Sequence, residues 1–259
     1  MMDLFHVASK DLLVFTLVFF RMSSLIITMP FFGGSYIPKK VGTAFVIAFS
    51  FIMYRTIDTS LITMPQSFYE YGICIAKEIG IGIFIGFVAS IAFFAVQLGG
   101  AIIAIQMGLQ QAMEIDPESN VNIPTMGQFF TLFVMAIFLL FNGHHYLLKL
   151  FVDSFQQIPV SHVHYQPEFF VFAIKAFNTI LIIGMRIAMP AMALMFVIMI
   201  ALAFIARLVP QMNVFILSLP AKIAGGLLVS ILCLPLMIVL FHDTFGQVME
   251  MLHRALTLL

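Results

Sequence analysis

The longest apolar stretch of the chain reads GICIAKEIGIGIFIGFVASIAFFAVQLGGAIIAI and occupies residues 72–105. As an α-helix it would be about 50 Å long, which exceeds the hydrocarbon thickness of a bilayer, about 30 Å. Gly82 and Gly86 form a GxxxG spacing, which allows two helices to approach closely. We expect a bend at Gly99-Gly100. The stretch therefore predicts a long helix packed closely against a neighbour.

The composition of the whole chain places it in a membrane or in a membrane-embedded assembly. Of its 259 residues 62% are hydrophobic and 9% are charged, whereas soluble domains carry about 25% charged residues. Its mean hydropathy is +1.11. The formal net charge is zero, which argues against a nucleic-acid-binding surface. A water-facing globular domain is excluded by this inventory.

Further apolar segments flank the longest one, and together they predict an all-α fold of long, kinked helices and helical hairpins. The segment 41–54 is short for a bilayer, and a kink is expected at Pro190. The beginning of the chain is expected to be an uncleaved first helix, and its end a separate amphipathic helix. Polar regions are expected at 55–71 and 142–167. The apolar segments are 12–32, 41–54, 72–105, 128–141, 169–205 and 214–241, and the terminal amphipathic helix is 242–259.

Several charged residues lie inside or at the edge of these apolar segments. A charge at the centre of a bilayer costs roughly 2.5–3.5 kcal/mol on the insertion scale, so the helices are expected to pack mainly against protein. Glu78 follows Lys77, and two readings of it stay open: a proton relay or a structural pair between helices. The charged residues are Arg21, Lys77, Glu78, Arg186 and Lys222.

A polar stretch, QMGLQQAMEIDPESNVNIPTM, follows directly at residues 106–126. Glu114, Asp116 and Glu118 are three of the 12 acidic residues in the chain, and the stretch contains no Lys or Arg. Such a segment cannot lie in hydrocarbon, because its backbone polar groups would stay unpaired. It is either a simple connector or the part that meets transported material.

Residues that bind metals or carry out catalysis give weak signals. Cys74 and Cys233 both lie in apolar runs, which fits small buried side chains or, alternatively, a disulfide or metal pair. The chain has no HExxH, GxSxG or glycine-rich phosphate-loop motif, so we expect no enzyme activity, no cofactor and no metal. Four histidines fit either a metal site or ordinary loop or interface positions; they are His144, His145, His162 and His164.

A second informative stretch, RLVPQMNVFILSLPAK, covers residues 207–222. It predicts a helix end, a proline turn and a new helix capped by Asn213. Residues 169–241 would then form a long helical hairpin with a polar tip. The tip is either a turn at a membrane surface or a part that docks against neighbouring subunits, where Arg207 and Lys222 would find acceptors.

Three motifs in this order resemble the family of the flagellar biosynthetic protein FliR. The family belongs to the export gate of the flagellar type III secretion system, and virulence injectisomes have a related subunit. The asparagine-glycine-histidine-histidine element and the loop containing Asp116-Pro117 are closer to the flagellar branch. Val209 stands where alanine is usual, and residues 218–222 depart from the commoner GFPLK. The motifs are GLQQAMEIDPESNVNIPTMGQFF, FLLFNGHHYLLKLFVDSF and ARLVPQMNVFILSLPAKI, at 108–130, 138–155 and 206–223.

The resemblance implies a subunit of a hetero-oligomeric helical ring with FliP-like and FliQ-like subunits, near FlhB-like and FlhA-like export components. Residues 1–165 would resemble FliP, and residues 166–259 would form a FliQ-like hairpin and terminal helix. The location implied is the bacterial inner membrane, in the flagellar basal body, multi-pass or partly extruded to the periplasmic side. The other partners implied are unfolded flagellar proteins in export and membrane lipid, without nucleic acid.

The resemblance also implies that loop 106–124 plugs the closed pore, near a methionine ring supplied by FliP. Alternatives are an injectisome gate subunit, a secondary transporter with helices broken at prolines, and a membrane enzyme that uses the histidines. The plug residues would be Gln106, Gln110, Gln111, Glu114, Asp116, Pro117, Glu118, Asn120 and Asn122. The candidate subunit-interface residues are Arg207, Pro210, Gln211, Asn213, Lys222, Lys77 and Glu78.

Overall fold

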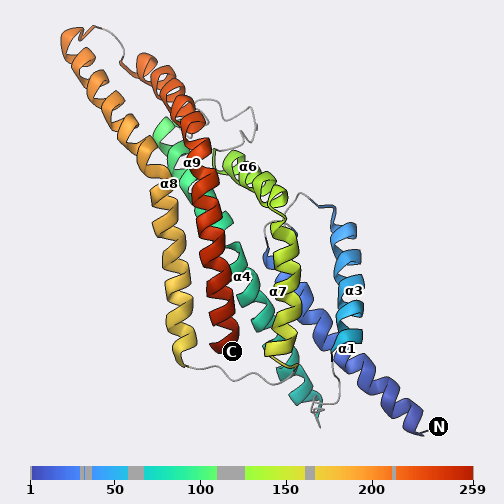
Figure 1. Ribbon diagram of the computed structural model, residues 1–259. Coiled ribbons are helices and arrows are strands. Elements are labelled where there is room, and N and C mark those ends of the chain that lie inside the picture. Colours follow the sequence, from blue (N-terminus) through green and yellow to red (C-terminus); the bar gives the residue numbers. More distant parts are fainter. Residues whose placement is uncertain are drawn as a thin grey trace. The chain divides into compact units, whose positions relative to one another are not determined.

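The computed structural model describes residues 2–29, 32, 37–57, 67–109, 126–160, 167–211 and 214–258, and this part of the chain contains helices and no strand. The all-α fold predicted from the sequence is therefore confirmed. Figure 1 shows the helices in chain order. They are α1 (Met2–Thr28), α3 (Lys39–Thr56), α4 (Phe68–Met107), α6 (Met126–Leu140), α7 (Gly143–Gln157), α8 (Pro167–Leu208) and α9 (Val214–Leu258).

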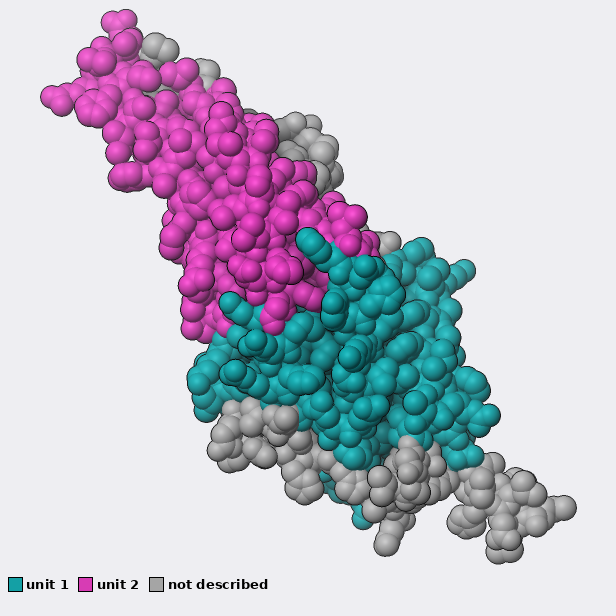
Figure 2. Space-filling model, in the orientation of Figure 1, with its two compact units in different colours: residues 1–91, 141–176, 247–259 teal, residues 92–140, 177–246 magenta. Residues whose placement is uncertain are grey.

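The chain divides into two compact units, each made of segments that are distant in sequence (Figure 2). Unit 1 comprises residues 1–91, 141–176 and 247–259, and unit 2 comprises residues 92–140 and 177–246. The division at residue 165 stays a prediction, because it concerns likeness to two other proteins and not compactness.

In unit 1, α1 and α4 are in contact at the GxxxG pair of α4. A Cβ added to Gly82 would lie 3.0 Å from the backbone nitrogen of Leu25, and one added to Gly86 would lie 2.8 Å from the Leu25 carbonyl oxygen. Ser90, one turn farther along α4, donates a hydrogen bond of 3.2 Å to the carbonyl oxygen of Thr28. The close helix approach predicted from the glycine spacing is confirmed, and any larger side chain at these two positions would push α1 away.

Helix α7 occupies much of the region 142–167 that we expected to be simply polar. Asn142 precedes it with φ 55°, a left-handed conformation that asparagine tolerates better than most residues. The buried side of α7 recurs at helical spacing, so hydropathy alone missed an amphipathic helix. Its buried residues are Gly143, Leu147, Leu150, Phe151, Ser154 and Phe155.

The core of unit 2 is built on Phe93 of α4. Its ring centroid lies 5.3 Å from that of Phe138 on α6 and 5.5 Å from that of Phe241 on α9. Phe138 also contacts Phe245, with centroids 5.6 Å apart. Both Phe138 pairs and the Phe93–Phe241 pair are edge-to-face, the geometry that aromatic pairs favour. Three helices are therefore joined by one aromatic cluster.

Helix α9 is a single helix, whereas two helices meeting at residue 241 were expected. It continues through both Pro220 and Pro235, and Phe241 and Thr244 are buried on either side of the expected break. Buried side chains then follow at helical spacing to Leu252, so one continuous helix places them all on one side.

Helices α8 and α9 lie side by side as an antiparallel hairpin within unit 2 (Figure 1). Gly225 of α9, which has no side chain, allows α8 to pack closely against α9. A Cβ at Gly225 would lie 3.9 Å from Leu194 of α8 and closer still to Ile198. Helix α8 continues through Pro190. The helical hairpin expected from the sequence is confirmed.

Candidate functional site

The buried charges of unit 1 form a cluster that joins three helices. The Arg21 guanidinium of α1 donates to the Glu78 carboxylate of α4 in an ion pair. Both side chains are 0% exposed. Arg21 Nη1 also donates to the carbonyl oxygen of Ile158 at 2.9 Å and, more weakly, to that of Ser154 at 3.3 Å. The guanidinium carbon lies 4.4 Å from the ring centroid of Phe155.

The cluster supports one of the two readings of Glu78, the structural pair between helices. Its carboxylate lies next to Arg21, with no exposed surface, so the structural pair between helices is the arrangement present. Arg21 in turn donates to carbonyl groups at the end of α7: that of Ile158, which follows the helix, and that of Ser154, which also accepts the backbone N–H of Ile158 at 3.0 Å. Lys77, the sequence neighbour of Glu78, is half-buried. The interface role expected for Lys77 and Glu78 stays a prediction.

The polar loop begins at the end of α4, where the backbone turns sharply. Gly108 adopts φ 75°, which glycine occupies without the penalty that a Cβ imposes. Its N–H donates a 3.0 Å hydrogen bond to the Ile105 carbonyl oxygen. Gln106, the first of the predicted plug residues, is half-buried, and Met107 beside it is fully buried. The start of the loop is therefore anchored in the core of unit 2.

Met107 is held in a socket that Gly226 of α9 leaves open. A Cβ added to Gly226 would lie 2.6 Å from the Met107 sulfur and 2.8 Å from its terminal methyl carbon. Such distances are shorter than van der Waals contact, so only glycine leaves the space that the methionine fills. This contact joins the end of α4 to the middle of α9.

The other end of the loop is fixed by two glycines that face each other. A Cβ added to Gly100 of α4 would lie 2.8 Å from the backbone nitrogen of Gly127 at the start of α6, and one added to Gly127 would lie 2.8 Å from the Gln97 carbonyl oxygen. The expected bend at Gly99-Gly100 is not a break, because α4 continues as one helix to Met107. Gly100 allows α6 to pack closely against α4.

The predicted plug residues between these anchors lie outside the described part of the chain. Only Gln106 is described, so the plug assignment stays a prediction. The residues outside are Gln110, Gln111, Glu114, Asp116, Pro117, Glu118, Asn120 and Asn122.

The predicted interface residues at the hairpin tip are mostly exposed. Arg207, Pro210 and Gln211 are exposed at the end of α8, while Lys222 is half-buried one turn and more inside α9. Asn213, the predicted helix cap, lies outside the described residues. The described part of the tip therefore exposes a cation and polar groups, and its docking to another subunit stays a prediction.

The helices of the hairpin expose large apolar side chains along much of their length. Exposed apolar area of this extent indicates contact with a membrane or with protein partners. The strongly exposed residues include Phe196, Val197, Phe204, Ile231 and Leu232, each 59–68% exposed.

Neither the cysteines nor the described histidines form a recognisable site. Cys74 and Cys233 form no disulfide with each other, which fits the interpretation as small apolar side chains. His144 and His145 lie on α7 with ring centroids 4.2 Å apart. In the part of the chain that the structure describes, no three His, Cys, Asp or Glu side chains could share a metal ion. His162 and His164 lie outside it.

Within the described ranges, four helices are long and apolar enough to cross a membrane, or up to five if the α6–α7 pair counts as one span. Two of the four are 40 residues long, about 60 Å as helices, and so exceed the bilayer core. The four are Asp11–Thr28, Phe68–Met107, Val171–Leu208 and Leu217–Leu256.

Comparison with known proteins identifies the family to which this arrangement belongs. Residues 12–248 match the family described as bacterial export proteins, family 1. The chain is 34% identical to the flagellar biosynthetic protein FliR of Bacillus subtilis (strain 168), over 94% of this chain and 95% of that protein. It is 28% identical to the protein of the same name from Escherichia coli (strain K12), over 90% and 88%, and 29% identical to that of Aquifex aeolicus (strain VF5), over 92% of each.

These matches span nearly the whole chain and include the three motifs on which the resemblance to FliR rests. The chain therefore belongs to the bacterial export proteins, family 1, and within it to the relatives of the flagellar biosynthetic protein FliR.

Proposed function

We propose that this protein is a subunit of the flagellar protein-export apparatus and forms part of the pore through which unfolded flagellar proteins leave the cytoplasm. The observation that carries the proposal is the match to bacterial export proteins over residues 12–248. The four long apolar helices support a place in the membrane, and we assign it to the bacterial inner membrane within the flagellar basal body.

The polar loop is the proposed plug of the closed pore. It has the composition of a segment that needs water or polar partners, since three carboxylates lie within residues 114–118. Its anchors at Met107 and Gly127 are buried in unit 2. A loop whose sequence contains no long apolar run can change shape without disturbing a packed core. Substrate entry would then displace the loop, while the helices on either side stay in place.

The proposed mechanism is gating and involves no chemical reaction by this chain. The protein would control passage through the lumen, and the energy for transport would come from other components of the apparatus. Among these we propose FlhB-like and FlhA-like proteins as neighbours.

The proposed partners in the ring are FliP-like and FliQ-like subunits. Support comes from the hairpin of α8 and α9, whose exposed apolar side chains need a cover, and from the exposed polar tip around Arg207. Co-expression tests this directly: the chain is expected to be recovered with both partner types and to lose yield when expressed alone. A stable monomer that transports a small solute would contradict the proposal.

The plug is tested by changing the loop between its anchors. Deletion of residues 110–122 leaves Met107, Gly108 and Gly127 in place, and is expected to raise ion leak through the assembled gate. Replacement of the same residues by an equally long Gly-Ser segment separates the length of the loop from its sequence. A deletion variant that assembles normally and leaks no more than the unaltered protein would exclude the plug.

A further inference from the structure

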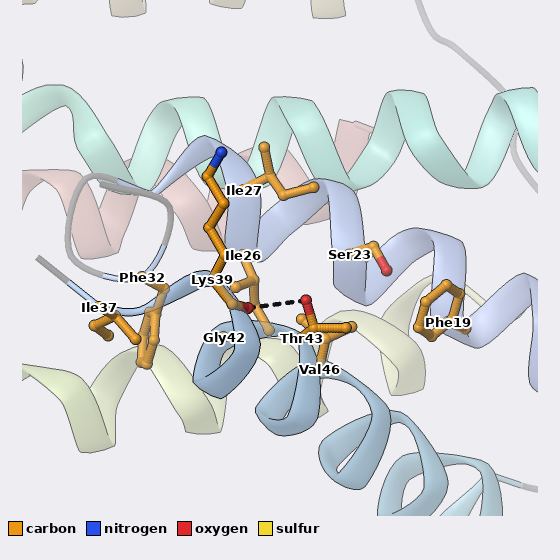
Figure 3. A pocket seen from close by; sticks show the side chains of 10 residues that line it. All are labelled: Phe19, Ser23, Ile26, Ile27, Phe32, Ile37, Lys39, Gly42, Thr43 and Val46. Carbon is orange, nitrogen blue, oxygen red and sulfur yellow. Dashed lines mark hydrogen bonds between the residues drawn. The ribbon is translucent and has the colours of Figure 1, made fainter. Parts of the chain in front are cut away.

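A pocket of about 400 Å³ lies between α1 and α3, in unit 1 and away from the polar loop in sequence. Its volume is within the range of about 300–1,000 Å³ that is usual for small-molecule sites. Apolar side chains form most of its wall (Figure 3). The lining residues are Phe19, Ser23, Ile26, Ile27, Phe32, Ile37, Lys39, Gly42, Thr43 and Val46.

Among the ten residues that line the pocket, Lys39 carries the charge. Figure 3 shows the side chain of Lys39 running from the beginning of α3 towards the α1 side of the pocket. Lys39 is exposed, and within the described residues its amino group takes part in no ion pair. The first turn of α3 contains no acidic residue. An amino group in this position, above an apolar cavity, would attract an anionic head group whose tail is apolar.

A second polar group lies deeper in the same wall. The hydroxyl oxygen of Ser23 is buried and has no hydrogen-bond partner in the described structure, although serine hydroxyls in helices often bind the carbonyl one turn earlier. By contrast, Thr43 across the pocket donates to the Lys39 carbonyl oxygen at 2.9 Å (Figure 3). Ser23 lies one turn of α1, about 6 Å, before Ile27. An unpaired buried hydroxyl is costly, but this oxygen has no accessible surface, so a ligand in the pocket would meet Lys39 and the apolar wall.

We propose that this pocket binds one anionic phospholipid. The phosphate would pair with the Lys39 ammonium, and an acyl chain would lie against Phe19, Ile26 and Val46. A membrane supplies such a molecule at high local concentration, and anionic lipid is attracted by lysines near its surface. Free phosphate shares the charge but would leave the apolar wall uncovered.

The absence of tryptophan from the sequence provides a clean reporter. Phe19→Trp places a single fluorophore in the pocket wall, and Phe177→Trp places one on α8, where Phe177 is 57% exposed. The full-length protein would be reconstituted into phosphatidylcholine vesicles that contain either brominated phosphatidylglycerol or brominated phosphatidylcholine. Quenching at position 19 is expected to favour phosphatidylglycerol about fivefold, the effect of one lysine near a membrane surface, and quenching at position 177 to show no preference.

Substitutions at the pocket separate specific binding from general attraction. Lys39→Gln is expected to abolish the preference, whereas Lys40→Gln removes the same charge from a residue that does not line the pocket and should retain it. A Cβ at Gly42 meets nothing within 4 Å, so Gly42→Phe can fill the pocket and should reduce quenching by both lipids, with Gly42→Ala as the size control.

Several results would overturn the proposal. If Lys39→Gln and Lys40→Gln had equal effects, the lipid preference would be nonspecific charge attraction. Equal quenching by both lipids at position 19 would show that the pocket does not select an anionic head group. Protection from quenching by inorganic phosphate alone would show a phosphate site without lipid. If Phe19→Trp does not fold, native mass spectrometry of the unaltered protein gives an independent measurement: one retained phosphatidylglycerol, lost in Lys39→Gln, is expected, and no retained lipid contradicts the site.

Discussion

Arg21 and Glu78 lie 57 residues apart in the sequence and form an ion pair in which neither side chain is exposed. The pair links α1 to α4, and the carbonyl groups of Ser154 and Ile158 bring in the end of α7. Buried charges are tolerated only when paired and hydrogen-bonded. The pair therefore fixes which faces of three helices meet in unit 1.

Removal of one member should harm the protein more than removal of both. Arg21→Met leaves the Glu78 carboxylate buried without its counter-charge, and we expect a loss of about 3–5 kcal/mol in the free energy of unfolding. The double variant Arg21→Met/Glu78→Met removes both charges and should recover much of this loss. Unfolding in mixed micelles measures the difference, with Lys149→Met on the exposed side of α7 as a control. A double variant less stable than Arg21→Met would contradict this account.

The contact between Gly100 and Gly127 should control the loop from outside its own sequence. Gly100→Ala places a methyl group 2.8 Å from the Gly127 nitrogen, and displacement of the start of α6 should raise ion leak and reduce export. The matched control is Gly246→Ala, because a Cβ there meets nothing within 4 Å. Alanine in an open helical position stabilises by about 1 kcal/mol relative to glycine. Equal leak in the two variants would show that the anchor has no role in closing the pore.

The Met107–Gly226 contact allows a rescue experiment. Gly226→Ala should lower stability by roughly 1–3 kcal/mol, the usual effect of overpacking a core. Met107→Ala creates a cavity and should cost about 2–5 kcal/mol by itself. In combination, the added methyl group occupies part of that cavity, so the double variant should be more stable than the sum of the two losses predicts. Purely additive losses would show that the two residues are not in contact.

The hairpin tip should be required for assembly. Arg207→Glu reverses an exposed charge at the end of α8 and is expected to reduce co-purification of the FliQ-like partner at least about tenfold, because like charges across an interface cost several kcal/mol. Lys149→Glu reverses a charge of the same sign on α7 and should leave assembly intact. Recovery of the complex at equal yield from both variants would place the interface elsewhere.

The sequence predicted the helices well where a long apolar stretch or a glycine spacing was present. The apolar stretch at 72–105 became α4, and the Gly82–Gly86 spacing indicated a real helix contact. The region 142–157 was misread because its average hydropathy is low, although Leu147, Leu150 and Phe151 already had the spacing of an amphipathic helix. For the same reason, averaging over residues separated α9 into an apolar and an amphipathic part.

Contacts between residues that are distant in the sequence could not be predicted from it. Nothing near Arg21 in the sequence indicates its partner, because helix periodicity shows which side of α1 is buried but not which helix covers it. The sequence left the partner of Glu78 open, and only the packing of α1 on α4 shows that it is Arg21. Likewise, the socket of Gly226 for Met107 depends on the register of two helices more than a hundred residues apart.

The separation between Arg21 and Glu78 has a consequence for how the chain is made. Synthesis proceeds from the N-terminus, so α1 leaves the ribosome with its arginine long before the glutamate exists, and the α7 carbonyls follow later still. Until then, the arginine disfavours stable insertion of α1 into lipid. The first helix therefore depends on later segments for its final place, and a ribosome that stops before α4 is complete would release a helix without a settled position in the membrane.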